Sequence, residues 1–423
     1  MNEYEKNEDV RTLYRPRVVD ARVEEYLSSF GGVQITGPKW CGKTWTGLCH
    51  SKSAVFISDE RSRKKAILSP EEVLRGERPR LIDEWQDVPN LWDVARNDID
   101  REGASGMYLF TGSSTPPENS TSHTGTGRFA RVMMRPMSLF ESGDSTGGIS
   151  LSGLFGGAVV PTSTSAMSYR KAVELICRGG WPSGLKTKNP HLPAQYLESV
   201  IWQDMSRVDG RKRSRSTMDS VLRSLARNTA TSVKKSTMAA DMSRDGKKTS
   251  EQTVSSYVDV LKRLFVIDEQ EPWNPRLRSK SRVRSTAKKH FIDPSLAVAA
   301  LGADAEAIID DPGYAGFLFE SLCYRDLSVY ASALGGKVKY FGDSNKFEID
   351  QIIELGNGRW GAAEVKLGGD ELDKAASNLL KLKDKVDGAK TPSFLMILTA
   401  TGELSYTRKE DGVAVVPVDL LGP

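Results

Sequence analysis

Short, largely apolar runs that end in glycine or polar residues recur in the first part of the chain. Val33–Ile35, Leu81–Ile82 and Met107–Phe110 are such runs, and Trp45–Cys49 can begin a helix after the first of them. Runs of this length predict buried strands, and strands that alternate with helices predict an open α/β sheet. We therefore expect residues 1–160 to form an α/β domain.

A helical pattern follows in residues 161–292. Apolar residues recur at helical spacing in Met218–Arg227, Lys235–Asp241 and Thr249–Leu261, and the apolar run Leu264–Ile267 predicts a strand. Three helices followed by a strand indicate a winged helix, a fold that contacts DNA or proteins and in some ATPases covers the nucleotide. The expected middle domain is therefore a helical lid with a winged helix. The Gly/Ser/Thr-rich residues 142–165 are the expected linker before it.

Strand patterns return in residues 293–423. Phe317–Leu327 predicts an apolar helix, and Lys337–Phe341, Phe347–Leu355 and Arg359–Lys366 predict three consecutive strands. A Gly-Asn-Gly turn joins the second strand to the third, which predicts a hairpin. The C-terminal part is therefore expected to be a separate α/β domain.

The segment Gly37–Thr44 matches the phosphate-loop pattern Gly-x-x-x-x-Gly-Lys-Thr at every fixed position, between a predicted strand and a predicted helix. Such a loop wraps phosphates with backbone N–H groups at a helix N-terminus. Lys43 is expected on the β- and γ-phosphates of ATP, and the Thr44 hydroxyl on Mg²⁺. The predicted nucleotide contacts of the loop are Gly37, Pro38, Lys39, Trp40, Cys41, Gly42, Lys43 and Thr44.

Two carboxylates and two hydroxyls end the next predicted strands. Asp83 and Glu84 close the strand that begins at Arg80, and an acidic pair of this kind holds the Mg²⁺ shell and polarises water in many ATPases. We assign Asp83 to the metal and Glu84 to the catalytic base. Thr111 and Ser113 follow the third strand and are candidates for sensing the γ-phosphate. Alone, an acidic pair at a strand end would indicate a solvated loop.

The formal net charge is only +4, but the positive charge is concentrated in the middle of the chain. Between Arg207 and Lys289 there are 21 Lys and Arg against 9 Asp and Glu. Arg211–Arg215 is one cluster, and in Arg276–Arg284 a cation recurs at every second residue. If extended, the second cluster would present its cations on one face, which suits a phosphate backbone. DNA is the expected partner, and a solvated basic loop is the alternative.

The C-terminal strands carry candidate catalytic residues. In the predicted hairpin, the side chains of Asp350, Glu364 and Lys366 can point to one face. Asp350 and Glu364 are expected to ligate Mg²⁺, Glu320 to add an acidic contact, and Lys366 to orient water or neutralise a developing phosphorane charge. This is a nuclease-type arrangement. The alternative is a structural salt bridge between Glu364 and Lys366.

Taken together, these motifs resemble those of a widespread prokaryotic family of AAA-type ATPases with a C-terminal domain of unknown function, itself similar to PD-(D/E)xK nucleases. The motifs that carry the resemblance are Gly37–Thr44, Leu81–Glu84, Leu109–Ser113, Gly125–Arg128, Arg135–Glu141, Gly179–Pro182, Phe319–Glu320 and Glu364–Lys366.

The resemblance implies further roles. Arg128 would reach the γ-phosphate bound to a neighbouring subunit as an arginine finger, with Arg131 and Arg135 as rivals, and Trp181 and Pro182 would border the nucleotide. A finger supplied in trans implies a homo-oligomer, for which a hexamer is expected.

The apolar runs, cysteines and histidines exclude several classes of protein. No apolar run is long enough to span a membrane, and the first residues lack the apolar region of a secretory signal, so we expect a cytoplasmic protein. The four cysteines form no Cys-x-x-Cys pair, and the four histidines do not cluster. A disulfide framework, a structural zinc and a transition-metal site are therefore not expected.

Two functions fit these observations. In the first, an ATP-hydrolysing ring remodels or translocates on DNA, with branched DNA such as a Holliday junction as the expected substrate, and the C-terminal domain binds or cuts the DNA. In the second, the protein is a signalling or defence switch that is controlled by nucleotide, and the nuclease-like domain is a scaffold or a triggered effector.

Overall fold

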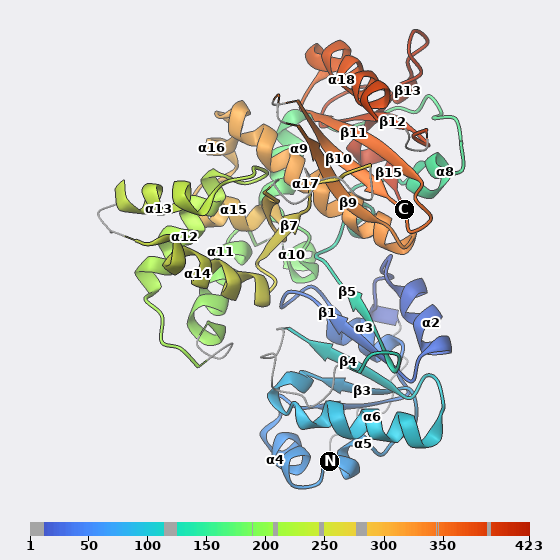
Figure 1. Cartoon of the computed structure of the whole chain (residues 1–423), viewed down its shortest axis with the longest axis vertical. Helices are drawn as coiled ribbons and strands as arrows, with labels where there is room; N and C mark the ends of the chain where they lie inside the picture. The colour runs from blue at the N-terminus through green and yellow to red at the C-terminus, as the bar shows by residue number, and fades with distance from the viewer. Residues whose placement is uncertain are drawn as a thin grey trace. The chain divides into compact units, whose positions relative to one another are not determined.

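The computed structural model describes residues 12–113, 125–187, 189–205, 210–244, 249–275, 286–343, 345, 347–386 and 391–423. Two compact units make up the chain (Figure 1). The first unit contains Met1–Pro136, Gln203–Lys212 and Arg263–Phe265. The second contains Met137–Trp202, Arg213–Lys262 and Val266–Pro423.

A parallel β-sheet forms the centre of the first unit (Figure 1). Its strands are β1 (Gly32–Thr36), β2 (Ser53–Phe56), β3 (Arg80–Asp83), β4 (Tyr108–Gly112) and β5 (Phe129–Met133). The spatial order is β2-β3-β4-β1-β5, and all neighbours pair in parallel. The carboxyl ends of β1, β3 and β4 therefore lie at one edge of the sheet, where ligands of open α/β sheets bind. The expected α/β architecture is confirmed.

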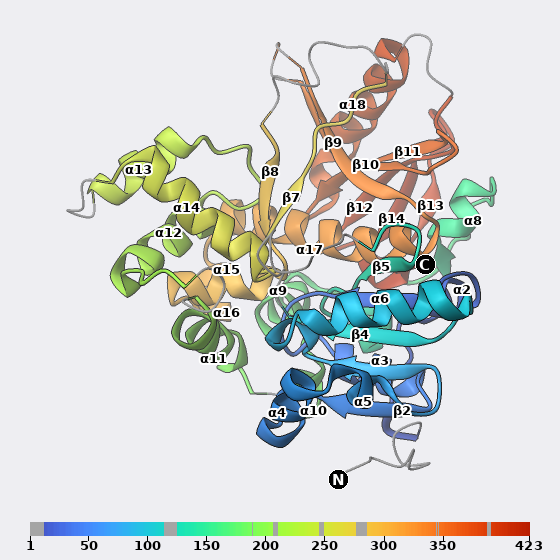
Figure 2. The same cartoon turned by 60° about the horizontal axis from the view of Figure 1, so that its bottom comes forward.

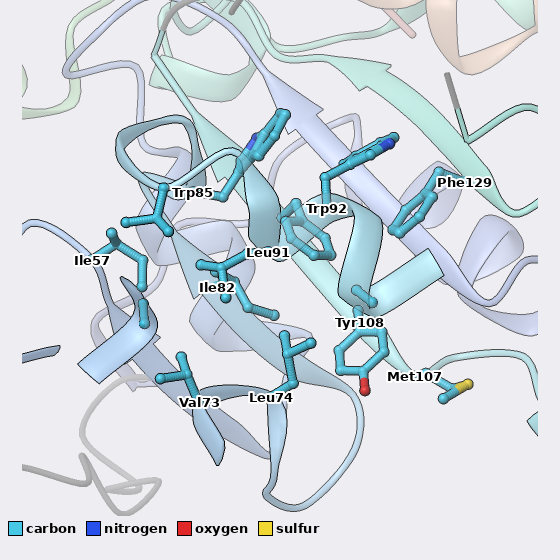
Figure 3. Packing of buried hydrophobic residues seen from close by; sticks show 14 of the residues in the cluster. Ile57, Val73, Leu74, Ile82, Trp85, Leu91, Trp92, Met107, Tyr108 and Phe129 are labelled. Atoms are coloured by element: carbon cyan, nitrogen blue, oxygen red, sulfur yellow. The ribbon is translucent and has the colours of Figure 1, made fainter. Parts of the chain in front are cut away.

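One helix precedes the first strand of the first unit, and the other helices lie between its strands. These helices are α2 (Asp20–Ser29), α3 (Lys43–Cys49), α4 (Glu60–Leu68), α5 (Pro70–Leu74), the 3-10 turn η1 (Trp85–Asp87) and α6 (Asn90–Glu102). Figure 3 shows the core beneath them. Trp92 stacks on Phe129 with ring centroids 4.0 Å apart and on Trp85 at 5.0 Å. This aromatic packing fixes the residues next to Trp85 and Phe129, which are Glu84 and Arg128.

Helices form much of the second unit. They are α7 (Leu139–Ser142), α8 (Leu151–Phe155), α9 (Tyr169–Arg178), α10 (Pro182–Thr187), α11 (Leu192–Ser199), α12 (Arg215–Arg227), α13 (Lys235–Arg244), α14 (Glu251–Arg263), α15 (Pro294–Leu301), α16 (Ala305–Ile309), α17 (Pro312–Ala333) and α18 (Leu372–Lys385). The π-helical turn η2 (Val200–Asp204) follows α11, and its last two residues belong to the first unit. The 3-10 turns η4 (Gly369–Glu371) and η5 (Val418–Leu420) lie near the C-terminal strands. Among the described residues, no helix is long and apolar enough to cross a lipid bilayer.

An antiparallel strand pair follows α12, α13 and α14 (Figure 2). Its strands are β7 (Ile267–Gln270) and β8 (Lys288–Phe291), with Gln270 opposite Lys288. The predicted strand Leu264–Ile267 begins later than expected. Phe265 has φ 54°, so the chain turns in a left-handed conformation between α14 and β7. An apolar run alone does not reveal such a turn.

A mixed sheet lies in the C-terminal part of the second unit. Its strands are β9 (Lys337–Gly342), β10 (Glu348–Glu354), β11 (Trp360–Lys366), β12 (Leu395–Thr399), β13 (Tyr406–Thr407) and β14 (Ala414–Pro417), in the order β13-β14-β12-β11-β10-β9. The predicted hairpin is confirmed, because β10 and β11 pair antiparallel with Gln351 opposite Ala363. Side chains of α18 and of these strands share one buried apolar cluster.

Residues 142–165, expected to be a linker, belong to the fold of the second unit. β6 (Ile149–Ser150) pairs in parallel with β15 (Leu421–Gly422), and Thr164 bridges to Leu404. The hydroxyl of Ser145 donates to the Leu421 carbonyl at 2.6 Å. The small polar residues that indicated a linker therefore satisfy backbone groups of distant strands.

Candidate functional site

The phosphate loop connects β1 to α3 as the sequence predicts. Gly42 has φ 107°, a left-handed conformation that favours glycine, and α3 begins at Lys43. Lys43 is buried, and its ammonium donates to the Pro38 carbonyl at 2.7 Å, so it lies within the loop itself. A Cβ on Gly37 would approach the Met134 carbonyl oxygen to 2.1 Å. Glycine is therefore required at both fixed positions.

The other predicted loop residues differ in exposure. Cys41 is buried, and the Trp40 side chain is 44% exposed. The Lys39 ammonium lies 2.8 Å from the carboxylate of Asp204. Lys39 and Asp204 both belong to the first unit. Asp204 had no signal in the sequence because 165 residues separate it from its partner.

Asp83 lies between two hydroxyls at the edge of the sheet. Its Oδ1 accepts from Thr44 Oγ1 at 2.9 Å and from Thr111 Oγ1 at 2.5 Å. Burial raises the pKa of Asp83, the charge of Glu84 adds to the rise, and the two hydroxyl bonds oppose it. The structure thus brings together Thr44, Asp83 and Thr111, which were predicted separately. Thr44 and Asp83 fit an oxygen-ligated Mg²⁺ ion.

Glu84 follows β3 in a left-handed conformation, with φ 55°. Its Oε2 accepts from Ser113 Oγ at 2.9 Å and from the side-chain amide of Gln86. Two donors therefore orient the carboxylate that was predicted to be the catalytic base. Gln86 was missed by the sequence analysis because its role depends on the turn η1, which brings residue 86 back to residue 84.

A second missed residue supports the loop. Arg17 is 7% exposed, and its guanidinium donates to the Cys41 carbonyl at 2.7 Å and to the Arg135 carbonyl at 2.8 Å. Charge-assisted bonds of this kind are stronger than neutral ones. Arg17 therefore holds the backbone of the phosphate loop against the end of β5. No motif in the sequence indicates this contact.

The segment before α2 is also tied to α3. The Tyr14 hydroxyl donates to Asp20 at 2.6 Å and lies 2.9 Å from Thr46 Oγ1, and His50 lies 3.1 Å from Asp20. Burial acts to raise the pKa of Asp20, but the bonds from His50 and Tyr14 outweigh it and lower that pKa. This network holds α3 in place behind the loop.

The three candidate arginine fingers differ in their surroundings. Arg128 is exposed, and its Nε donates to the carboxylate of Asp100 on α6 at 2.6 Å. Arg131 is exposed on β5. Arg135 is partly buried, and its carbonyl accepts a hydrogen bond from Arg17. The finger role stays a prediction for all three. Arg128 and Arg131 are the two with exposed side chains.

Trp181 and Pro182 belong to the second unit. Trp181 is fully buried, stacks on Tyr196 at 4.5 Å, and donates from its indole N–H to Ser295 Oγ at 3.1 Å. Pro182 begins α10. Packing within the second unit accounts for the tryptophan without a nucleotide, so the predicted nucleotide contacts stay predictions.

The carboxylates of the second unit converge as the hairpin predicts. Asp350 Oδ2 accepts from the Val365 N–H at 2.9 Å, and the Lys366 ammonium lies 3.3 Å from Glu364. Glu364 is 3% exposed. Burial and then the charge of Asp350 raise the pKa of Glu364 to about 8. The contact between Glu364 and Lys366 that the structural alternative requires is present, at 3.3 Å.

Glu320 lies close to the same group but contacts a cation that the sequence analysis had not singled out. The Lys288 ammonium lies 2.7 Å from Glu320 Oε1. Burial and the charge of Asp350 raise the pKa of Glu320 to about 8, although Lys288 acts to lower it. Among the described residues, no group of three or more His, Cys, Asp or Glu side chains is arranged to hold a metal ion. The predicted Mg²⁺ site at Asp350 and Glu364 stays a prediction.

The two basic clusters are only partly described. Arg276–Arg284 lies outside the described residues. In the other cluster, Arg211 and Lys212 are exposed, and Arg215 forms an ion pair with Glu198 at 3.1 Å. The exposed cations fit a solvated surface and a DNA-binding surface equally well.

Three family models match separate segments of the chain. Residues 30–142 match an AAA domain. Residues 169–307 match a domain of unknown function, DUF8612, and residues 315–421 match another, DUF4143. The parallel sheet of the first unit is typical of a P-loop ATPase core. The predicted ATPase domain and C-terminal domain of unknown function are confirmed, and the likeness to nucleases stays a prediction.

Similar proteins are found among curated sequences and solved structures. The uncharacterized proteins Mb2031c of Mycobacterium bovis and Rv2008c of Mycobacterium tuberculosis are each 23% identical over 363 residues, which covers 84% of this chain and 74% of the relative. The Walker-type ATPase PABY2304 of Pyrococcus abyssi is 15% identical, with a TM-score of 0.42 over 69% of this chain and 97% of that one. The RuvB Holliday junction branch migration motor of Thermotoga maritima is 14% identical, with a TM-score of 0.26 over 69% and 98%.

Proposed function

We propose that this chain is an ATPase that hydrolyses ATP with Mg²⁺ to remodel or translocate on DNA, with branched DNA as the substrate. The observation that carries the ATPase proposal is the convergence of Thr44, Asp83 and Thr111 beside the phosphate loop, with Glu84 held by Ser113. The AAA domain match at residues 30–142 supports the same reaction.

Each residue of the site has a distinct task in this proposal. Lys43 neutralises the phosphates. Thr44 and Asp83 would hold Mg²⁺, which would supply positive charge to stabilise the transferred phosphoryl group. Glu84 accepts a proton from the attacking water, and Ser113 and Gln86 keep its carboxylate oriented. Arg17 holds the Cys41 carbonyl and thereby the shape of the loop.

Contact with DNA is proposed for the second unit. The order α12, α13, α14, β7, β8 is compatible with the predicted winged helix, and the basic residues found in the sequence lie in and around these elements. Cations that neutralise DNA phosphates release counterions, so the affinity falls as salt rises. A homohexamer with an arginine finger in trans completes the proposal.

The test is ATP turnover by the whole chain with and without linear duplex, single-stranded and four-way junction DNA at one salt concentration. Stimulation that is strongest with the junction supports a DNA motor. Lys43→Ala is the control, because it must lose turnover under every condition. Turnover that depends on Lys43 but responds to none of the DNAs contradicts the motor.

A nucleotide-controlled switch is the second candidate function. It is favoured by the ion pair between Lys39 in the phosphate loop and Asp204, which links the loop to a segment outside the AAA domain match. A switch would hydrolyse ATP slowly with or without DNA, and its oligomeric state would change between ADP and ATP. Light scattering with each nucleotide distinguishes the two candidates.

A further inference from the structure

Lys288 begins β8 and places its ammonium among the carboxylates of the second unit. Nζ lies 2.7 Å from Glu320 Oε1, 2.5 Å from Glu348 Oε1 and 4.0 Å from Asp350 Oδ1. The Tyr340 ring centroid lies 5.4 Å from Nζ, within the range of a cation–π contact. Only 1% of the Lys288 side chain is exposed. Three acidic side chains and an aromatic ring therefore surround one buried cation.

The Lys288 ammonium and a divalent metal ion would compete for the same negatively charged carboxylates. A buried cation is stable only when it is paired, and here Glu320 and Glu348 supply the partners. A divalent ion on Asp350 would face an ammonium 4.0 Å from that carboxylate, and like charges repel strongly where water is excluded. The strand pair that carries Lys288 is itself held to the C-terminal sheet, because the side-chain amide of Gln270, which lies opposite Lys288, donates to the Asp350 and Lys339 carbonyls.

We infer that Lys288 is the resident cation of this carboxylate cluster. Its ammonium supplies the positive charge beside Asp350 that a metal ion ligated by Asp350 and Glu364 would otherwise supply. The cluster therefore holds no divalent ion and does not cleave DNA through a metal-activated water. Instead, it fastens the β7–β8 pair to α17 and β10, so the C-terminal part of the second unit serves as a scaffold. The inference does not rest on the proposed ATPase function.

The test measures Mn²⁺ binding by electron paramagnetic resonance of the full chain without nucleotide. All proteins carry Asp83→Asn, so that the carboxylate predicted to hold Mg²⁺ in the first unit is removed. Lys288 is either kept or replaced by methionine, which has a similar length and no charge. We expect the Lys288 protein to leave Mn²⁺ free in solution, and Lys288→Met to bind Mn²⁺ at least ~10-fold more tightly because the unpaired carboxylates then recruit a cation.

Two companion proteins decide whether binding occurs in this cluster. Adding Asp350→Asn to Lys288→Met should abolish the new Mn²⁺ signal. The inference is overturned if the protein that keeps Lys288 binds Mn²⁺ and Asp350→Asn removes that binding. It is also overturned if Lys288→Met folds, as judged by near-UV circular dichroism, and binds no Mn²⁺. If Lys288→Met fails to fold, the inference is still tested by comparing Mn²⁺ binding between the protein that keeps Lys288 and its Asp350→Asn variant.

Discussion

Substitution of single side chains of the first unit should separate nucleotide binding from turnover. Lys43→Ala removes the ammonium inside the phosphate loop, so we expect nucleotide binding to be lost. Glu84→Gln keeps a side chain of the same size but cannot accept a proton, so we expect binding to persist and turnover to fall at least ~100-fold. Fluorescence anisotropy with a labelled ATP analogue and phosphate release measure the two effects.

The matched control for these variants is Glu71→Gln, which removes an exposed carboxylate on α5. It should leave both binding and turnover unchanged. Normal ATP hydrolysis by Glu84→Gln would show that another group accepts the proton, and the orientation of Glu84 by Ser113 would then be structural.

The raised pKa of Glu364 predicts how the stability of the second unit depends on pH. The pKa of its carboxyl is raised from 4.5 to about 8 by burial and by Asp350, so the folded state keeps a proton that the unfolded chain releases near pH 4.5. The stability of the second unit should therefore fall as the pH rises between these values. Glu364→Gln cannot ionise, so its melting temperature should fall less between pH 5 and 8 than that of the wild type.

Differential scanning calorimetry at about pH 5 and pH 8 makes this comparison. Glu403→Gln is the control because that carboxylate is exposed in the same unit, and its melting curve should follow the wild type. An identical pH dependence in wild type and Glu364→Gln would mean that Glu364 is already ionised at pH 5 and that the Lys366 pair dominates.

At the scale of elements, one buried ion pair joins α15 and α17. The Arg325 guanidinium donates to Asp293 at 2.8 Å, and both side chains are at most 2% exposed. Asp293 also accepts from the backbone N–H groups of Gly180 and Ser295. Asp293→Ala leaves the guanidinium buried without this partner, so we expect a loss of about 3–5 kcal/mol in the free energy of unfolding. Urea unfolding followed by circular dichroism measures it.

The control for the buried Asp293–Arg325 pair is an exposed ion pair in the second unit. Arg170 on α9 pairs with Glu306 on α16 across surfaces that are 55% and 67% exposed. Arg170→Ala should cost less than about 1 kcal/mol, because water screens exposed pairs. Equal losses from Asp293→Ala and Arg170→Ala would show that α15 and α17 are held together by apolar packing alone.

The elements of the chain were predictable where local chemistry decides them. The phosphate loop, β3 ending at Asp83 and the β10–β11 hairpin each have a local pattern, and the structure confirms all three. The contacts of Arg17 and Lys288 were not predictable, because they join segments far apart in the chain with no motif to mark them. The segment 142–165 was misjudged for the same reason, since its strand partner is β15.

At the scale of the whole molecule, the proposed arginine finger makes activity depend on assembly. Arg128→Ala should lower ATP turnover by several orders of magnitude if the residue acts across a subunit interface. Mixing Arg128→Ala chains with Glu84→Gln chains should restore part of the turnover, because some interfaces then combine an intact Glu84 with an intact Arg128. Phosphate release from the mixture and from each variant alone measures this.

Arg131→Ala is the rival variant in the mixing experiment. Recovery with Arg131→Ala and none with Arg128→Ala would transfer the finger role to Arg131. Absence of recovery with either, together with a monomer by light scattering in the presence of nucleotide, would contradict a finger in trans.

The pairing of β6 with β15 affects the order in which the two units can fold during synthesis. The sheet of the first unit draws on residues 32–133 and can form while the rest of the chain is still being made. Ile149 on β6 can pair with Leu421 only after Leu421 has been synthesised, so β6 stays unpaired through most of translation. Pairings between such distant segments form slowly and leave apolar surface exposed in the meantime. Chaperone dependence during expression should therefore be a property of the second unit rather than of the ATPase domain.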